Sequence, residues 1–424
     1  MPRSSSTRAM LFIRCMNDFQ YRPRWISDII RRRHEDFPVV VVTGMRQAGK
    51  STLLRREPPF SEYDLLDLDD LELRGRLRVD AGLAWDGRSR VVLDEVHKVP
   101  ELLEALKAHV DACAGAFRAV LSGSAVLLLH RGVAESLAGR ASYVTLGPCT
   151  LGEWESHPPP SVLEDLLAGR APTGRGRATD AAAVIARGLL PAVLGHNDPS
   201  AWWEAYTATY LERDLRDLSA VQSLPDFRRL LGLVALRTSQ TLNETAMAGE
   251  LGLSQPTVHR HVNLMEVSGV VQRLPAFFRN RGKRIAKRPK LHVTDPGMAA
   301  FLAGLYTPEA VRRASEAGAL FESLVRQHVA VLASLMSPTA RLFHWRTSDG
   351  KEVDLIIEHG RSVVAMECKL SHRVTHHDAR HLRLFKELHP ECVAAAVVYT
   401  GEEVVALGRG VWAVPWTLLA GLQG

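Results

Sequence analysis

The chain has 424 residues, of which 46% are hydrophobic and 24% charged, a globular composition in a chain too long for one ordinary hydrophobic core. No window approaches the roughly 18 uninterrupted apolar residues of a membrane span, and the scattered cysteines form no CxxC pair, which argues against a disulfide framework and a cysteine-ligated zinc site. We therefore expect two or three domains in a reducing cytoplasm and no membrane partner, while the net charge of +6 is too small to identify other partners.

The first half of the chain alternates predicted helices and strands. Residues 1–23 are basic and rich in serine, and we expect a disordered leader there. A short helix from Trp25 precedes a strand at 38–43, and further strands are expected at 63–68, 90–94 and 119–122. This alternation predicts an α/β unit over residues 24–155, with a parallel sheet covered on both faces. Residues 156–200 contain many turn formers, so we expect a loop-rich connection there rather than core.

The stretch TGMRQAGKST at residues 43–52 matches the phosphate-binding pattern GxxxxGK[ST]. Its place between a strand and a helix suits ATP, because glycines let successive backbone N–H groups surround the phosphates and the helix N-terminus adds positive charge. In this interpretation Lys50 reaches the β- and γ-phosphates and Ser51 binds Mg²⁺. The predicted nucleotide contacts are Gly44, Met45, Arg46, Gln47, Ala48, Gly49, Lys50, Ser51 and Thr52.

Acidic and hydroxyl residues follow the next two apolar strands. Asp94 and Glu95 end the strand at 90–94, where we expect Asp94 in the Mg²⁺ shell and Glu95 beside the attacking water. Ser122 and Ser124 follow the strand at 119–122, and they either approach the γ-phosphate or belong to an ordinary turn. Arg140 is a candidate for stabilising the transition state in its own subunit or in a neighbouring one, although most arginines are only solvated.

Residues 201–305 are mostly helical and contain a helix-turn-helix pattern at 241–265. Two strands, at 270–274 and 291–294, flank a run at 279–290 with seven basic residues and no acidic one, as in the hairpin of a winged helix. Such a run is either a solvated loop or a nucleic-acid contact. The DNA-contact candidates are Gln255, Thr257, His259, Arg260, Arg281, Lys283, Arg284 and Lys287.

A second group of charged residues lies in the C-terminal part, residues 306–424. A helix at 317–335 precedes strands at 341–346, 352–358 and 362–368. Glu367 and Lys369 are two residues apart in a strand and therefore share a face, near Asp354 on the neighbouring strand. Carboxylates that converge on a divalent metal beside a lysine suit phosphodiester hydrolysis. We therefore predict Asp354, Glu367 and Lys369 as catalytic residues, with Glu322 as a third acidic metal ligand.

Several segments are similar, in order, to a known family: TGMRQAGKSTLL, LDEVHKVPELLEALK, LSGSAVLLL, SLAGRASYVTLGPCTLGEW, YLERDLRDL and RPKLHVTDPGMAAFLAG. The chain resembles the bacterial and archaeal AAA+-related P-loop ATPases whose ATPase core is followed by domain of unknown function 4143. The resemblance implies that Arg140 lies near the nucleotide site. It also implies a C-terminal domain similar to the PD-(D/E)xK, or restriction-endonuclease-like, nuclease core, in which the fold can persist without activity.

Two functions are consistent with the sequence. In the first, ATP binding and hydrolysis drive action on DNA, through the winged helix and a C-terminal domain that binds or cleaves it. In the second, the ATP state controls a protein partner, the helix-turn-helix only packs, and the nuclease-like domain is catalytically silent. The sequence does not determine the oligomer, but an Arg140 that acts on a neighbour requires a homo-oligomer.

Overall fold

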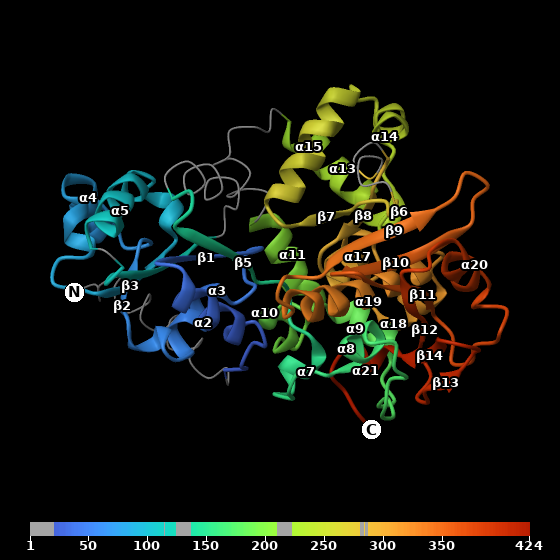
Figure 1. The fold of residues 1–424 in the computed structure, drawn as a ribbon. Coiled ribbons are helices and arrows are strands. Elements are labelled where there is room, and N and C mark those ends of the chain that lie inside the picture. Colours follow the sequence, from blue (N-terminus) through green and yellow to red (C-terminus); the bar gives the residue numbers. More distant parts are fainter. Residues whose placement is uncertain (1–20, 114, 124–136, 210–222, 280–283, 285–286) are drawn as a thin grey trace.

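The computed structural model describes residues 21–113, 115–123, 137–209, 223–279, 284 and 287–424. Figure 1 shows a first sheet with its helices on one side of the molecule, a second sheet on the other, green helices between them and yellow helices at the top of the view. Ser124, Arg281 and Lys283 lie outside the described residues, as does nearly all of the expected leader. Within the described residues, no helix is both long and apolar enough to cross a membrane.

The first sheet has five parallel strands in the order β2-β3-β4-β1-β5. The expected strands are present, and β5 is one that the sequence pattern did not indicate. The elements of this unit are α2 (Ser27–Asp36), β1 (Val39–Thr43), α3 (Lys50–Arg56), η1 (Phe60–Glu62), β2 (Asp64–Asp67), α4 (Leu71–Val79), η2 (Ala81–Ala84), β3 (Arg90–Asp94), η3 (Val96–Lys98), α5 (Glu101–Ala112), β4 (Arg118–Ser122), β5 (Ala141–Thr145) and α7 (Leu151–Trp154).

Both faces of this sheet are buried, which explains why β1 is an unbroken run of apolar residues. Val40 and Val42 pack with α2 and α3 on one face, whereas Val39 and Val41 pack with α4 and α5 on the other. All five residues of β1 are buried. The sheet therefore holds the end of β1, where the P-loop begins, in a fixed position.

The connection at 156–200 differs from the expected loop, because it contains α8 (Val162–Leu167), α9 (Ala181–Arg187) and α10 (Pro191–Leu194). Leu163, Leu166 and Ile185 are buried in the largest hydrophobic cluster. These helices are short and are separated by proline and glycine, so their apolar periodicity is hard to detect. They form part of the core.

The middle region, residues 199–313, combines helices with a small antiparallel sheet of order β6-β8-β7. The two helices of the expected helix-turn-helix are present, and the second begins with Ser254 as its N-cap, whose side chain accepts a hydrogen bond from the Thr257 amide. Its elements are α11 (Pro199–Thr209), α13 (Leu224–Leu236), β6 (Gln240–Thr241), α14 (Glu244–Leu251), α15 (Gln255–Val267), β7 (Val271–Leu274), β8 (Lys290–Val293), α17 (Pro296–Leu302) and α18 (Pro308–Arg313).

The C-terminal region is built on a mixed six-stranded sheet of order β13-β14-β12-β11-β10-β9. Alternate residues of β11 pack on opposite faces, with Val364 and Met366 in the cluster that contains α19, and Val363 and Ala365 in the cluster that contains α20. Its elements are α19 (Ala317–Ser334), β9 (Arg341–Arg346), β10 (Glu352–His359), β11 (Ser362–Lys369), α20 (Arg380–Leu388), β12 (Cys392–Tyr399), β13 (Val405–Ala406), β14 (Val411–Pro415) and α21 (Trp416–Leu419).

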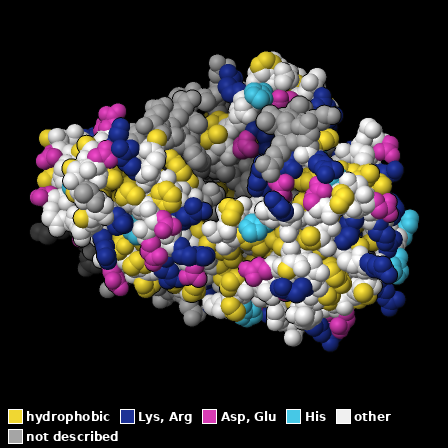
Figure 2. All heavy atoms as spheres, viewed as in Figure 1, with side chains coloured by type: hydrophobic (Ala, Val, Ile, Leu, Met, Phe, Trp, Pro, Cys, Tyr) yellow, Lys and Arg dark blue, Asp and Glu magenta, His cyan; other side chains and the backbone are white. Residues whose placement is uncertain are grey.

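The three regions share one hydrophobic cluster, which extends from Val40 in the first sheet to Val398 in the second. The C-terminal end also returns to the first region, where the Gly152 amide donates a 2.7 Å hydrogen bond to the Ala420 carbonyl. Charged side chains of both signs are interspersed over the first region, whereas Lys, Arg and His gather over α20 (Figure 2).

Candidate nucleotide site and charged cluster

The P-loop connects β1 to α3 and contains two glycines with backbone conformations that other residues rarely adopt. Gly44 has φ +139°, and a Cβ there would lie 2.1 Å from the Leu146 carbonyl oxygen. Gly49, immediately before α3, has φ +95°. Between them Met45 and Ala48 are buried, Arg46 is half-buried and Gln47 is exposed. The glycines are thus required by the path of the loop itself.

Lys50 is buried, and its ammonium lies inside the loop. Its Nζ donates hydrogen bonds to the carbonyl oxygens of Gly44 at 3.0 Å and Met45 at 2.9 Å. Ser51, the next residue in α3, donates from its hydroxyl to Asp94 Oδ1 at 3.1 Å. Thr52 follows on the same helix and is exposed. The loop thus brings its cation and its hydroxyl to the edge of the sheet where β1 and β3 end.

Asp94 is buried at the end of β3, and its Oδ1 accepts hydrogen bonds from the Ser122 hydroxyl and from the Glu95 amide. Ser122 ends β4, the strand between β1 and β3, so the sheet order places this serine beside both motifs. Adjacent ligands of an octahedral Mg²⁺ lie roughly 2.9 Å apart, close to the 3.1 Å between Ser51 and Asp94. The pair therefore fits Mg²⁺.

Glu95 follows Asp94 in the left-handed conformation, with φ 54°. Its Oε2 lies 3.3 Å from Nδ1 of His97, so one carboxylate oxygen is paired with a neighbouring imidazole. A left-handed residue other than glycine costs of the order of 1 kcal/mol. Glu95 is thus held at the same edge of the sheet, next to the Ser51–Asp94 pair.

Three residues from outside the motifs also contact the P-loop. Arg24 is buried and donates to the Ala48 carbonyl at 2.8 Å, while its Nε lies 3.2 Å from Glu153. Tyr206 of α11 donates to the Arg46 carbonyl at 3.3 Å. Gly269, after α15, lies so close that a Cβ on it would be 3.2 Å from the Met45 amide nitrogen. The loop is therefore braced by the N-terminal segment and by the middle region.

Arg140 lies at the opposite edge of the sheet. It directly precedes β5, and its carbonyl oxygen accepts from Val39, the first residue of β1, whereas the P-loop follows Thr43 at the other end of that strand. At about 3.3 Å per residue, the length of β1 separates the two edges by roughly 13 Å. The guanidinium binds Asp111 instead, with Nη2 at 2.9 Å from Oδ2. The expectation that Arg140 lies near the nucleotide of its own subunit is therefore wrong.

The residues of α15 predicted to contact nucleic acid are surface residues. Arg260 is exposed and Thr257 is half-buried. Gln255 and His259 are exposed too, but both side chains contact the Glu244 carboxylate on α14, at 3.0 Å. They help to line an open pocket of about 650 Å³ between α14, α15 and the segment before β8.

The basic run does not form a uniformly exposed surface. Arg284 is 7% exposed and donates to both oxygens of Glu358 on β10, at 2.8 and 2.9 Å. Its guanidinium also lies 4.6 Å from the ring centroids of Phe277 and Phe343. The prediction that Arg284 contacts nucleic acid is wrong, because a paired, desolvated guanidinium cannot reach a phosphate. Lys287 is exposed near Phe278.

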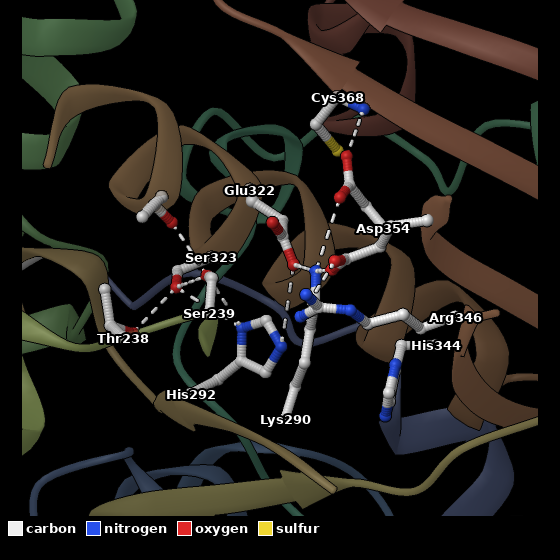
Figure 3. Close-up of polar contacts among 12 residues, drawn as sticks. Thr238, Ser239, Lys290, His292, Glu322, Ser323, His344, Arg346, Asp354 and Cys368 are labelled. Carbon is white, nitrogen blue, oxygen red and sulfur yellow. Dashed lines mark hydrogen bonds and ion pairs between the residues drawn. The ribbon is translucent and has the colours of Figure 1, made fainter. Parts of the chain in front are cut away.

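Two of the three predicted metal ligands of the C-terminal region contact a lysine. Lys290, the first residue of β8, is 3% exposed, and its Nζ lies 2.9 Å from Glu322 and 3.3 Å from Asp354 (Figure 3). Glu352, which the sequence did not single out, lies 2.5 Å from the same nitrogen. A divalent ion held by Glu322 and Asp354 does not fit this arrangement, because an ammonium lies between them. Within the described ranges, no group of three or more His, Cys, Asp and Glu side chains is arranged to hold a metal.

Glu367 and Lys369 share a face of β11, as predicted, and their side chains are 2.8 Å apart. Burial raises the pKa of Glu367 to about 7, with a further contribution from the negative charge of Asp354 and opposition from Lys369. Glu367 directly precedes Cys368, whose amide binds Asp354, and it uses one oxygen to bind Lys369.

Sequence reasoning did not identify Arg24, Lys290 or Glu352 as site residues. In the sequence, Lys290 is simply the last cation of the basic run at 279–290. A usable signal was its place at the start of the apolar strand KLHV, since a lysine in a buried strand requires acidic partners. Arg24 and Glu352 carry no such local signal.

Three family models match the chain in order. An AAA domain matches residues 36–155, domain of unknown function DUF8612 matches 178–309, and domain of unknown function DUF4143 matches 317–419. Among solved structures, the Walker-type ATPase paby2304 of Pyrococcus abyssi is 17% identical, with a TM-score of 0.43 over 67% of this chain and 99% of that one. The RuvB Holliday junction branch migration motor of Thermotoga maritima is 14% identical, with a TM-score of 0.27 over 59% of this chain and 89% of that one.

Two curated relatives match most of the chain. Uncharacterized protein Rv2008c of Mycobacterium tuberculosis and uncharacterized protein Mb2031c of Mycobacterium bovis are each 30% identical over 388 residues, which is 91% of this chain and 82% of the relative. The chain therefore belongs to the family of these two mycobacterial proteins, and its first region is an AAA-type P-loop ATPase-like domain.

Proposed function

We propose that the protein binds and hydrolyses ATP at the P-loop. The observation that carries this proposal is the contact between Ser51 and Asp94 beside Lys50, where a hydroxyl, a carboxylate and an ammonium meet at one edge of the sheet. Lys50 binds the β- and γ-phosphates, and Ser51 and Asp94 hold the metal. Mg²⁺, when bound, neutralises phosphate charge. Glu95 accepts the proton of the attacking water.

The nucleotide state passes from the P-loop to the middle region. Tyr206 and Gly269 touch successive residues of the loop, Arg46 and Met45. The Gly269 carbonyl in turn accepts a 2.6 Å hydrogen bond from Thr294, just after β8. A loop that rearranges around phosphates must therefore move against α11 and the turn after α15. This coupling supports a nucleotide-switched ATPase, and a protein partner that binds the middle region is the first candidate for what the switch controls.

DNA association is the second candidate. It is supported by the exposed cations Arg260, Lys287 and Arg288 beside α15, and by the basic surface over α20 in Figure 2. The double variant Arg260→Ala/Lys287→Ala distinguishes the candidates in a DNA titration at several salt concentrations. If the variant binds DNA more weakly and the slope of log K against log salt concentration is smaller by about two, DNA association is favoured, because each phosphate contact releases about one counterion. Unchanged binding favours the protein-partner function.

The ATPase proposal is tested by steady-state hydrolysis and by equilibrium binding of a fluorescent ATP analogue. We expect Lys50→Ala to lose binding, whereas Glu95→Gln keeps binding and hydrolyses at least ~100-fold more slowly, the usual contribution of a general base. Lys107→Ala, which removes an exposed lysine of α5 in the same domain, is the matched control. Hydrolysis by Lys50→Ala at the wild-type rate would refute the assignment.

A further inference from the structure

The cluster around Lys290 combines residues of two regions. Lys290 comes from the small sheet of the middle region, whereas Glu322 comes from α19 and both Glu352 and Asp354 from β10. Figure 3 shows the Lys290 side chain rising between the carboxylates of Glu322 and Asp354. Its ammonium has three N–H donors and three carboxylate partners, at 2.9, 2.5 and 3.3 Å. The donors and acceptors therefore match in number.

The distances suit an ammonium rather than a divalent ion. Mg²⁺ binds oxygen at about 2.0–2.1 Å and Ca²⁺ at about 2.3–2.6 Å, whereas two of the three oxygens lie 2.9 Å or more from Nζ. A divalent ion at this point would have to displace the lysine, since the two cations cannot share one position. The carboxylates are thus arranged around a cation that the chain itself supplies.

The charge of the cluster is compensated by the protein. Arg346 lies 3.5 Å from the second oxygen of Glu352, and the second oxygen of Asp354 accepts a 2.9 Å hydrogen bond from the Cys368 amide. Burial and the charge of Asp354 raise the pKa of Glu322, whereas the Lys290 ammonium opposes that rise because it stabilises the carboxylate. Burial disfavours the charge of Lys290, but the three carboxylates outweigh it and raise the pKa of that lysine. Two cations of the chain, Lys290 and Arg346, thus already offset most of the negative charge of the three carboxylates.

We propose that the Lys290 ammonium is a built-in cation that occupies the position of a divalent metal in the C-terminal domain. The acidic cluster then ties the middle region to the C-terminal sheet and does not form a metal-dependent hydrolytic centre. The proposal also assigns a latent site: without the ammonium, Glu322, Glu352 and Asp354 leave a carboxylate-lined space that takes a small divalent cation such as Mn²⁺.

The test measures Mn²⁺ binding to the full chain without nucleotide, from the electron paramagnetic resonance signal of free Mn²⁺. Wild type and Asp354→Asn should bind equal amounts, because neither holds an ion at this cluster. Lys290→Ala should gain one bound Mn²⁺, and Lys290→Ala/Asp354→Asn should lose it again. Any ion bound near the P-loop is common to all four proteins and cancels in the comparison.

Two results would overturn the proposal. The first is an Mn²⁺ ion in the wild type that Asp354→Asn removes, and the second is a folded Lys290→Ala variant that gains no ion. If Lys290→Ala does not fold, the comparison of wild type with the nearly isosteric Asp354→Asn still decides whether the native cluster holds a metal. Mn²⁺-dependent cleavage of plasmid DNA by wild type, lost in Asp354→Asn, would also contradict it.

Discussion

Replacing Gly269 by alanine tests whether the middle region senses the nucleotide. Gly269 has φ +77°, and an added Cβ would lie 3.2 Å from the Met45 amide nitrogen and 3.3 Å from the Met45 Cβ. Met45 belongs to the P-loop, and the Thr294 hydroxyl donates a hydrogen bond to the Gly269 carbonyl. The methyl group would therefore press on the loop, because the glycine cannot retreat freely.

Gly252 provides a matched control. It ends α14 with φ +66°, and a Cβ there would meet no atom within 4 Å. In both variants an alanine in the left-handed conformation costs about 1–2 kcal/mol of unfolding free energy. Gly269→Ala should lose about 1 kcal/mol more, the lower end of the cost of overpacking. If displacement of the P-loop relieves that strain, ATP affinity falls roughly 5- to 10-fold, since about 1.4 kcal/mol is a factor of ten.

The assay is an equilibrium titration with a fluorescent ATP analogue, beside chemical denaturation of wild type and both variants. We expect both variants to lose the same unfolding free energy from the left-handed alanine, and Gly269→Ala to lose about 1 kcal/mol more. Only Gly269→Ala should bind ATP more weakly. A folded Gly269→Ala protein with wild-type affinity would refute the reasoning. An equal loss of affinity in Gly252→Ala would do the same, because an added Cβ there meets no atom within 4 Å.

Three further predictions concern pH, stability and catalysis. Burial lowers the pKa of His328 to about 4, so between about pH 4 and 6.5 the native state binds fewer protons than the unfolded chain and loses stability as the pH falls. In denaturation experiments, His328→Leu should therefore lose less unfolding free energy than wild type between pH 7 and 5. An equal loss in both proteins would contradict this. Glu358→Gln leaves the buried Arg284 without its charge partner and should lower the unfolding free energy by about 3 kcal/mol. A shift of the denaturation midpoint that corresponds to less than about 1 kcal/mol would show that the pair is not effectively buried. Arg140→Ala should hydrolyse ATP at the wild-type rate in dilute monomer, with Asp111→Ala as control, and a tenfold loss in monomer would contradict its placement at the far edge of the sheet.

Local patterns predicted much of the fold. The P-loop, the strand that ends at Asp94 and the two helices at 244–251 and 255–267 were foreseen because glycine spacing, apolar runs and capping residues are signals within a few positions of the chain. β5, with its alternating buried and exposed residues, and the short helices at 162–194 were missed. A short element in a packed core leaves little periodicity to detect.

Local sequence signals therefore suffice for the nucleotide motif, for the alternation that builds the parallel sheet, and for the acids at the end of β3 and near the start of β10. The pairing of charged side chains depends instead on how distant elements pack. Arg140 lies at the far edge because β5 pairs in parallel with β1, which places the start of β5 beside the start of β1. Arg284 is buried against Glu358, which is 74 positions away along the chain. Lys290 entered the acidic cluster in the same way, through partners 32 and 64 positions away. The partner of a buried charge is set by the packing of distant elements, which no local pattern records.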